Sequence, residues 1–201
     1  ASEDALPLAT VQAFSIDDSA TTEIDDALSV QGMGSGTGTL GVHIAAPGLA
    51  IVPGTPLDQL ARSRLSTVYM PGYKITMLPD EVVQKYTLTE GKECPAVSLY
   101  VTLNETTLDI KSTQTRLERV LIGANLRHDQ LDTVVTTEWL EDPTFRHEID
   151  PQPLQHKREQ LSFLYRLAKD LKAKREVVRG KPENFNRPDY NYRLVGNEGA
   201  E

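Results

Sequence analysis

Five carboxylates stand within ten consecutive residues near the start of the chain, and their density limits how this segment can fold. They are Asp17, Asp18, Glu23, Asp25 and Asp26. Closely spaced carboxylates repel one another, so one of them protonates unless a cation is present. The chain has no Lys or Arg before Arg62. Because the intervening residues are mainly serine and threonine, a loop is favoured over a helix, and a loop can turn Asp17 back toward the later acids.

The ligand chemistry of this segment points to one kind of ion. Oxygen-only ligands at this density suit a hard divalent cation, Mg²⁺ or Mn²⁺, better than zinc. Such a cation can bind a phosphate oxygen, lower the pKa of a bound water and stabilise a leaving oxygen, which is the chemistry of phosphodiester hydrolysis. The alternative is an exposed acidic loop that binds nothing specific. The spacing of the acids alone does not decide between these interpretations.

Charge is divided unevenly along the chain. The net charge of −8 taken alone argues against a nucleic-acid-binding protein. The first 61 residues hold eight acids and no Lys or Arg, so they account for the whole net charge. Residues 157–181 hold nine Lys or Arg against three acids. We interpret this basic stretch as a solvated face.

Features of membrane or secreted proteins are missing from the sequence. No apolar run approaches the roughly 20 residues of a spanning helix, and the first residues have neither the basic region nor the apolar core of a signal peptide. The single cysteine, Cys94, excludes an internal disulfide and a cysteine-based zinc site. We therefore expect a cytoplasmic protein with no membrane partner.

Hydrophobic periodicity predicts a mixed α/β or α+β fold. Strands are expected at residues 10–16, 27–31, 39–45, 96–103 and 108–116. Helices are expected at residues 56–67, 126–140 and 153–178, and the last of these ends at Gly180. The Gly-rich residues 32–38 predict a hairpin between the second and third strands. Residues 1–11 are interpreted as a linker and residues 12–201 as the domain.

A glycine pattern and the four histidines are interpreted as parts of the fold and not as binding or catalytic sites. Residues 36–41 match G-x-G-x-x-G, but they lead into a strand, so no helix N-terminus is available for a pyrophosphate. We interpret them as a hairpin turn. The four histidines, His43 among them, are scattered without metal-ligand spacing. Each is interpreted as a hydrogen-bonded core residue or a surface residue.

The acidic segment also matches a known pattern. Asp17, five residues, then Glu23-Ile-Asp25-Asp26-Ala resembles the Asp-x5-Asp-x-Asp-Asp-Ala signature of the ribonuclease II / ribonuclease R (RNB) family of exoribonucleases. The similarity continues through four further stretches, which begin at His43, Arg64, Met77 and Arg187. It therefore covers nearly the whole chain from about residue 12. Glu23 and Ala46 depart from the usual family residue, which is aspartate at both positions.

The resemblance implies an activity and a catalytic site. It implies 3′-to-5′ hydrolysis of single-stranded RNA to nucleoside 5′-monophosphates with Mg²⁺, or Mn²⁺ in its place. It also implies an RNB-type catalytic core, with a mixed, largely antiparallel sheet flanked by helices. The acids carried over by position are Asp17, Glu23, Asp25 and Asp26. Among them, Asp17 and Asp25 resemble metal ligands, and Glu23 and Asp26 complete the cage or hold water.

Two aromatic residues are carried over in the same way. Tyr69 matches the family tyrosine that clamps the 3′-terminal nucleotide, and stacking on a base suits an enzyme that ignores sequence. The alternative for Tyr69 is a tyrosine packed beside a Pro-Gly turn. Phe185 matches a second stacking aromatic, although the alignment there needs a gap.

The family pattern extends beyond this sequence. The RNB domain is considerably longer, and its second half carries a Gly-x-Arg-x-Tyr-x-His segment that nothing here matches. We therefore expect the rest of the RNB domain and its flanking RNA-binding domains to lie outside this chain. Because that arginine helps at the phosphate, we expect the 201 residues alone to be inactive or nearly so. Two alternatives stay open: a truncated, catalytically inactive RNA-binding or scaffold module, and a simple magnesium-binding or structural domain.

Overall fold

The chain forms two compact units in the computed structural model, which describes residues 3–146 and 152–183. The first unit comprises the chain up to Ala46 together with Tyr86–Lys181, and the second contains Pro47–Lys85. The acidic segment belongs to the first unit and Tyr69 to the second.

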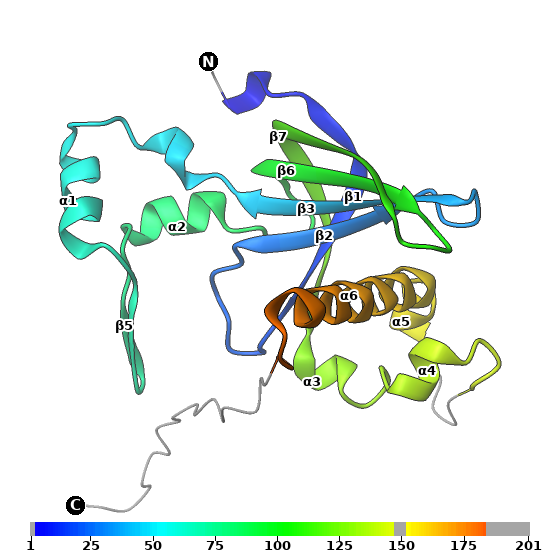
Figure 1. The fold of residues 1–201 in the computed structure, drawn as a ribbon. Coiled ribbons are helices and arrows are strands. Elements are labelled where there is room, and N and C mark those ends of the chain that lie inside the picture. Colours follow the sequence, from blue (N-terminus) through cyan, green and yellow to red (C-terminus); the bar gives the residue numbers. More distant parts are fainter. Residues whose placement is uncertain (1–2, 147–151, 184–201) are drawn as a thin grey trace, which may run out of the picture. The chain divides into compact units, whose positions relative to one another are not determined.

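A closed five-stranded barrel forms the centre of the first unit, with strand order β1-β2-β3-β6-β7 (Figure 1). Its strands are β1 (Leu8–Asp17), β2 (Asp26–Gln31), β3 (Thr37–Ala45), β6 (Glu93–Asn104) and β7 (Ile110–Arg127). Neighbouring strands are antiparallel except β1 and β7, which run parallel and close the barrel. Closure pairs both outer strands and so leaves the barrel without an open edge.

Helices lie outside the barrel in the same unit. They are the 3₁₀ helix η1 (Glu3–Ala5) and the α-helices α3 (His128–Leu131), α4 (Thr137–Glu141), α5 (Gln152–Gln155) and α6 (Arg158–Arg179). Helix α6 runs along one side of the barrel (Figure 1), where Phe163 and Leu167 pack with Val30 and Leu103 of the strands. It ends at Gly180, which takes a positive φ of 67° that glycine adopts without strain.

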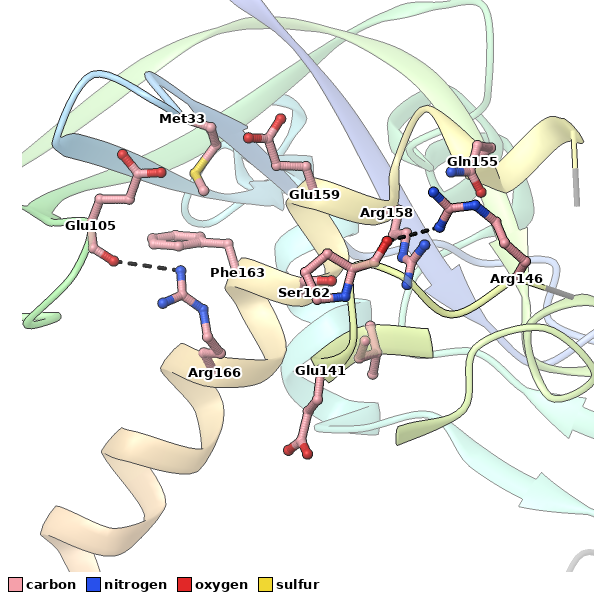
Figure 2. A pocket seen from close by; sticks show the side chains of 12 residues that line it. Met33, Glu105, Glu141, Arg146, Gln155, Arg158, Glu159, Ser162, Phe163 and Arg166 are labelled. Carbon is pink, nitrogen blue, oxygen red and sulfur yellow. Dashed lines mark hydrogen bonds between the residues drawn. The ribbon is translucent and has the colours of Figure 1, made fainter. Parts of the chain in front are cut away.

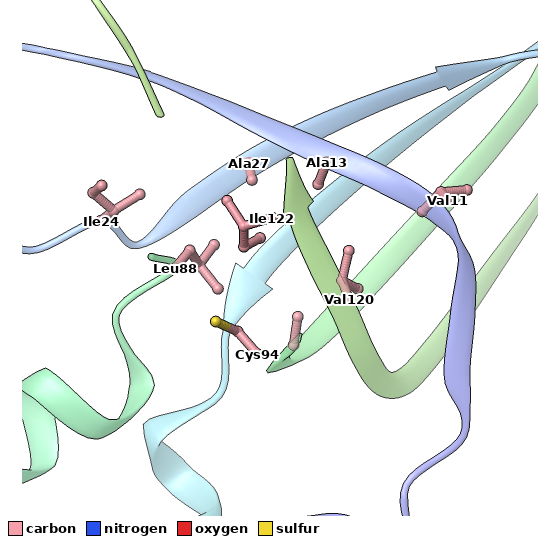
Figure 3. Packing of buried hydrophobic residues seen from close by; sticks show 9 residues of the cluster. Val11, Ala13, Ile24, Ala27, Leu88, Cys94, Val120 and Ile122 are labelled. Atoms are coloured by element: carbon pink, nitrogen blue, oxygen red, sulfur yellow. The ribbon is translucent and has the colours of Figure 1, made fainter. Parts of the chain in front are cut away.

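The barrel interior is filled by two adjoining groups of side chains. One group is an apolar cluster that includes Ala13, Leu88 and Ile122 (Figure 3). Three alanines in this cluster keep the interior narrow enough to be filled by a few larger side chains. The other group is polar and fully buried: Ser29, His43, Ser98 and Glu118.

The second unit consists of short elements. They are the 3₁₀ helix η2 (Pro47–Ala50), α1 (Pro56–Arg64), the strands β4 (Val68–Met70) and β5 (Tyr73–Ile75), and α2 (Asp80–Tyr86). Helix α1 begins where Thr55 Oγ1 accepts a hydrogen bond from the Asp58 amide at 3.4 Å. Strands β4 and β5 form an antiparallel hairpin.

The mixed class, with a largely antiparallel five-stranded sheet and flanking helices, confirms the prediction. Several boundaries differ. The helix predicted at 56–67 ends at Arg64, and the helix predicted at 153–178 is divided into α5 and α6. β1 begins at Leu8, so residues 8–11 of the predicted linker belong to a strand. The single helix predicted at 126–140 is wrong, because β7 continues to Arg127 and two short helices follow.

The helix-like spacing at 126–140 has a physical origin. Leu126, Leu131 and Trp139 all pack into one cluster, although they belong to a strand and to two separate helices. The second helix starts anew because Thr136 Oγ1 accepts a hydrogen bond from the Trp139 amide at 3.2 Å. None of the described helices has the length and hydropathy needed to cross a membrane.

Candidate functional site: the acidic loop between β1 and β2

The acidic segment forms the connection between two neighbouring strands of the barrel. Asp17 is the last residue of β1 and Asp26 is the first of β2. The two strands are antiparallel, with Phe14 opposite Leu28, so both acids lie at the same end of the barrel. Topology therefore brings the first and the last acid of the signature to one end of the fold.

Buried apolar residues hold the second half of this loop in place. Ile24 and Ala27 are 4% and 1% exposed and belong to the barrel core (Figure 3). The Ile24 amide donates to Thr87 Oγ1 at 2.7 Å, and its carbonyl accepts from the Leu88 amide at 2.9 Å. Asp25 and Asp26 lie between the two buried residues and are exposed. The Ile-Asp-Asp-Ala part of the signature thus has a structural reason, since its two apolar residues anchor a pair of exposed carboxylates.

Asp17 is the acid with an unusual environment. Its Oδ2 atom is buried and has no hydrogen-bond partner within the part of the chain that the structure describes. A buried carboxylate oxygen without a partner is costly unless a proton, a water or a cation supplies one. The Asp17 side chain therefore fits the ligand chemistry of a hard cation.

The four predicted ligands are not gathered into one cluster. Among residues 3–146 and 152–183, no three His, Cys, Asp or Glu side chains lie close enough together to hold a metal ion. The loop places Asp17, Glu23, Asp25 and Asp26 on one connection, but it does not bring three of them around one point. The donor set is all oxygen and fits Mg²⁺ in kind, and the metal role of these acids stays a prediction.

A cation from a distant part of the chain meets the acidic loop. Arg127, the last residue of β7, is paired in parallel register with Asp17. Its Nη1 donates to the carbonyl oxygens of Asp18 and Thr21 at 2.9 and 3.1 Å. His128 follows, with Nε2 4.0 Å from Asp18 Oδ1. No signal in the sequence identified Arg127, because its contact with Asp18 joins residues 109 apart.

Tyr69 lies on the β4–β5 hairpin of the second unit. It is 74% exposed, so it does not pack beside the Pro-Gly turn as the structural alternative required. Its directly paired neighbour is Lys74, and paired residues in an antiparallel hairpin share one face. An exposed ring beside an ammonium group is suited to a stacked base and its phosphate. Phe185 lies outside the described residues.

The buried histidine of the barrel is structural. His43 is fully buried, its Nε2 lies 2.8 Å from Ser29 Oγ, and its Nδ1 lies 2.8 Å from Ser98 Oγ. Burial lowers the pKa of His43 to about 4, which the charge of Glu118 only partly offsets. Glu118 in turn accepts a hydrogen bond from the Tyr100 hydroxyl at 2.5 Å, and burial raises the pKa of Tyr100. This network satisfies buried polar groups, and His43, Ser29, Ser98 and Glu118 are themselves buried.

The interpretation of residues 36–41 as a hairpin turn is wrong for most of the match: the turn ends at Gly36, and residues 37–41 belong to β3. The backbone amides of the Gly-rich β2–β3 turn nevertheless bind an anion, the side chain of Glu105 from the β6–β7 turn. The Gly34 amide lies 2.9 and 3.0 Å from the two carboxylate oxygens, and the Gly36 amide lies 3.1 Å from one of them. Because the protein's own carboxylate occupies this nest, the turn is not available to a phosphate.

A cavity of about 810 Å³ opens elsewhere on the first unit (Figure 2). Its lining includes Met33, Glu105 and Phe163, and none of the signature acids. Its arginines are engaged with the backbone: Arg158 donates to the Trp139 carbonyl at 2.8 Å, and Arg146 donates to the Pro143 carbonyl at 2.8 Å. Met33 and Glu105 lie at the opposite end of β2 and β6 from Asp26, so this cavity is separate from the acidic loop.

Comparison with known proteins agrees with this fold. The RNB domain family matches residues 6–200. The chain is 39% identical to an uncharacterized ribonuclease of Synechocystis sp. over 99 residues, which are 49% of this chain and 15% of that protein. The chain belongs to the RNB family.

Solved structures of two related proteins share the fold. Ribonuclease R of Mycoplasma genitalium, in complex with ribose-methylated single-stranded RNA, matches with a TM-score of 0.66 at 18% identity, over 85% of this chain and 26% of that one. Yeast Ssd1, described as a pseudonuclease, matches with a TM-score of 0.66 at 26% identity, over 94% of this chain and 21% of that one. The chain thus spans only a minor part of the length of these relatives, which are a ribonuclease and a protein described as a pseudonuclease.

Proposed function

We propose that this chain is part of an exoribonuclease that degrades single-stranded RNA from its 3′ end by metal-assisted hydrolysis and releases nucleoside 5′-monophosphates. The observation that carries the proposal is the complete set of four signature acids on the β1–β2 connection of an RNB fold. The Asp17 Oδ2 atom is buried and has no hydrogen-bond partner among the described residues, which supports a cation there.

Each group has a proposed role. Asp17 and Asp25 hold the cation, and Glu23 and Asp26 complete its surroundings or hold water. Mg²⁺ or Mn²⁺, when bound, polarises the phosphate and makes a bound water more acidic. Tyr69 stacks on a base near the 3′ end, which gives affinity without sequence preference. The remainder of the protein supplies further contacts to the phosphate and the RNA strand.

The second candidate is an inactive RNA-binding module. Two observations favour it: the extensive match to the pseudonuclease Ssd1, and the lack of a three-ligand cluster among the described residues. The retention of all four acids favours the enzyme, since a module that only binds RNA gains nothing from closely spaced negative charges near a phosphate backbone.

The test separates hydrolysis from binding in the full-length protein. Single-stranded RNA labelled at its 5′ end is incubated with Mg²⁺ or with EDTA, and affinity is measured separately in EDTA. We expect Mg²⁺-dependent stepwise shortening that Asp25→Asn abolishes, while RNA affinity stays within about twofold because the lost group acts only in the reaction. Asp80→Asn, at an exposed helix start outside the signature, is the matched control and should leave the rate unchanged. RNA binding without shortening in the wild type would establish the inactive module instead.

A further inference from the structure

The first half of the acidic loop is held by one guanidinium nitrogen. Residues 18–21 form a turn in which the Thr21 amide donates to the Asp18 carbonyl at 2.9 Å. The carbonyl oxygens at the two ends of this turn, those of Asp18 and Thr21, both accept from Arg127 Nη1, at 2.9 and 3.1 Å. Two hydrogens on a single nitrogen therefore fix both ends of the turn.

Strand pairing explains why Arg127 is in the right place. β7 runs parallel to β1, and the two strands end together with Arg127 opposite Asp17. The chain then turns into α3 at His128, so Arg127 is the last residue that the strand ladder positions. Its backbone is fixed by the barrel, and only its side chain extends over the loop.

The two halves of the loop are anchored differently. The second half is fixed by backbone pairing and burial, since the Asp25 carbonyl accepts from the Ala45 amide at 2.8 Å and Ile24 is in the core. The first half contains no core residue among residues 18–21, of which Thr21 alone is partly buried and the others are exposed. Repulsion between five carboxylates acts to spread this segment, and the Arg127 charge and its two hydrogen bonds oppose that spread.

We propose that Arg127 is a positioning residue that holds residues 18–21 of the acidic loop in their turn conformation, at the end of the barrel where Asp17 and Asp26 lie. The expected effect of Arg127 on cation binding rests on the proposed function. Its effect on the conformation of the loop does not. Arg127 takes no part in bond breaking. The positive charge of Arg127 also offsets part of the negative charge of the acidic loop, because the first 61 residues contain no Lys or Arg.

The same strand supplies a matched control. Arg119, eight residues before Arg127 on β7, also donates to a backbone carbonyl, that of Leu6 at 3.4 Å, and pairs with Glu93 at 2.9 Å. It ties down the start of β1 at the far end from the acidic loop. A variant at Arg119 therefore measures the general effect on the barrel of losing an arginine where β1 and β7 pair.

The experiment compares Arg127→Met, Arg127→Lys and Arg119→Met in the full-length protein. Methionine keeps an unbranched stem but removes the donors, and lysine keeps the charge and a donor. Amide hydrogen exchange of residues 18–26 is measured first, in EDTA and without RNA. Binding of Mn²⁺ to the RNA-free protein is then followed by electron paramagnetic resonance, and RNA affinity is measured in EDTA.

Arg127→Met should speed exchange at residues 18–22 about tenfold and weaken Mn²⁺ binding by a similar factor, the size expected for a lost charge-assisted hydrogen bond. Arg127→Lys should recover part of both, and Arg119→Met should change neither. Unchanged loop exchange in Arg127→Met, or equal effects of both methionine variants, would overturn the proposal. If the wild type binds no Mn²⁺, the proposed metal chemistry fails, and loop exchange alone decides the role of Arg127. If Arg127→Met does not fold, Arg127→Lys decides. Amide exchange as slow as in the wild type together with weakened Mn²⁺ binding in Arg127→Lys would contradict the proposal.

Discussion

The imidazole Nε2 of His43 lies 2.8 Å from the hydroxyl oxygen of Ser29, inside the barrel and out of contact with solvent. A second hydroxyl, that of Ser98, lies 2.8 Å from Nδ1. One neutral ring can donate to one hydroxyl and accept from the other, so the neutral form is satisfied without a counter-ion. The histidine of the His-Ile-Ala stretch is thus a hydrogen-bonded core residue, which is one of the two interpretations that the sequence left open.

The first prediction concerns the pH dependence of stability. The folded barrel lowers the pKa of His43 to about 4 from 6.5, because burial disfavours the imidazolium. Between these pH values His43 binds more protons in the unfolded chain than in the folded one. The contribution of His43 to the free energy of unfolding is therefore fully present above about pH 6.5 and is lost as pH falls toward 4. From pH 7.5 to pH 5 this lowers the free energy of unfolding by about 2 kcal/mol.

Urea unfolding at several pH values checks this effect. His43→Asn should flatten the dependence between pH 7.5 and pH 5, whereas His156→Asn, at an exposed histidine, should leave the wild-type slope. A slope in His43→Asn equal to that of the wild type would assign the pH dependence to the carboxylates instead.

The second prediction concerns Gly41, which faces the same hydrogen bond. A Cβ atom at this position would lie 2.3 Å from Ser29 Oγ and 2.7 Å from His43 Nε2. Gly41→Ala should therefore displace both side chains and destabilise the protein by about 1–3 kcal/mol, the usual range for overpacking. Gly48→Ala is the control, because no atom lies within 4 Å of its Cβ.

A double variant makes the Gly41 test specific. Ser29→Ala removes the nearest clashing atom, so Gly41→Ala should cost less in that background than in the wild type. Thermal unfolding gives all four values of the cycle. Strict additivity of the two changes would show that the clash with Ser29 is not the cause.

The third prediction concerns Glu105 and the Gly-rich turn. Its carboxylate accepts from the Gly34 and Gly36 amides, so Glu105→Ala leaves these donors to water and frees a turn of flexible glycines. We expect a loss of about 1–2 kcal/mol in the free energy of unfolding and faster amide exchange at Gly34 and Gly36. RNA hydrolysis should be unaffected, because the turn is at the other end of the barrel from the acids. A large loss of activity with normal stability would contradict this separation.

Local sequence signals predicted the parts of this fold that depend on neighbours in the chain. The β2–β3 hairpin follows from alternation around a Gly-rich turn, and the end of α6 follows from Gly180. The continuation of β7 to Arg127 could not be predicted, because its pairing partners lie in β1 and β6, far away in sequence. The acids lie close together in the sequence, so their spacing identifies them. Arg127 contacts their loop from a distant strand, so no local pattern identifies it.

The last prediction concerns the face of the β4–β5 hairpin that is proposed to bind RNA. Tyr69 and Lys74 are directly paired and share one face, whereas Tyr73 pairs with Met70 and lies on the other face. Tyr69→Ala should weaken single-stranded RNA binding about tenfold, as expected for one lost base stack, and Tyr69→Phe should retain it. Lys74→Gln should weaken binding and reduce the dependence of affinity on salt by about one phosphate contact.

Tyr73→Ala is the matched control for this face, because Tyr73 is also an exposed tyrosine of the hairpin, at 67% against 74% for Tyr69. Fluorescence anisotropy of a labelled oligonucleotide in EDTA, at several salt concentrations, measures all four variants without hydrolysis. Since stacking requires only the face of the ring, the Phe variant separates it from hydrogen bonding by the hydroxyl. Equal losses for Tyr69→Ala and Tyr73→Ala would mean that the hairpin as a whole, and not one of its faces, determines RNA binding.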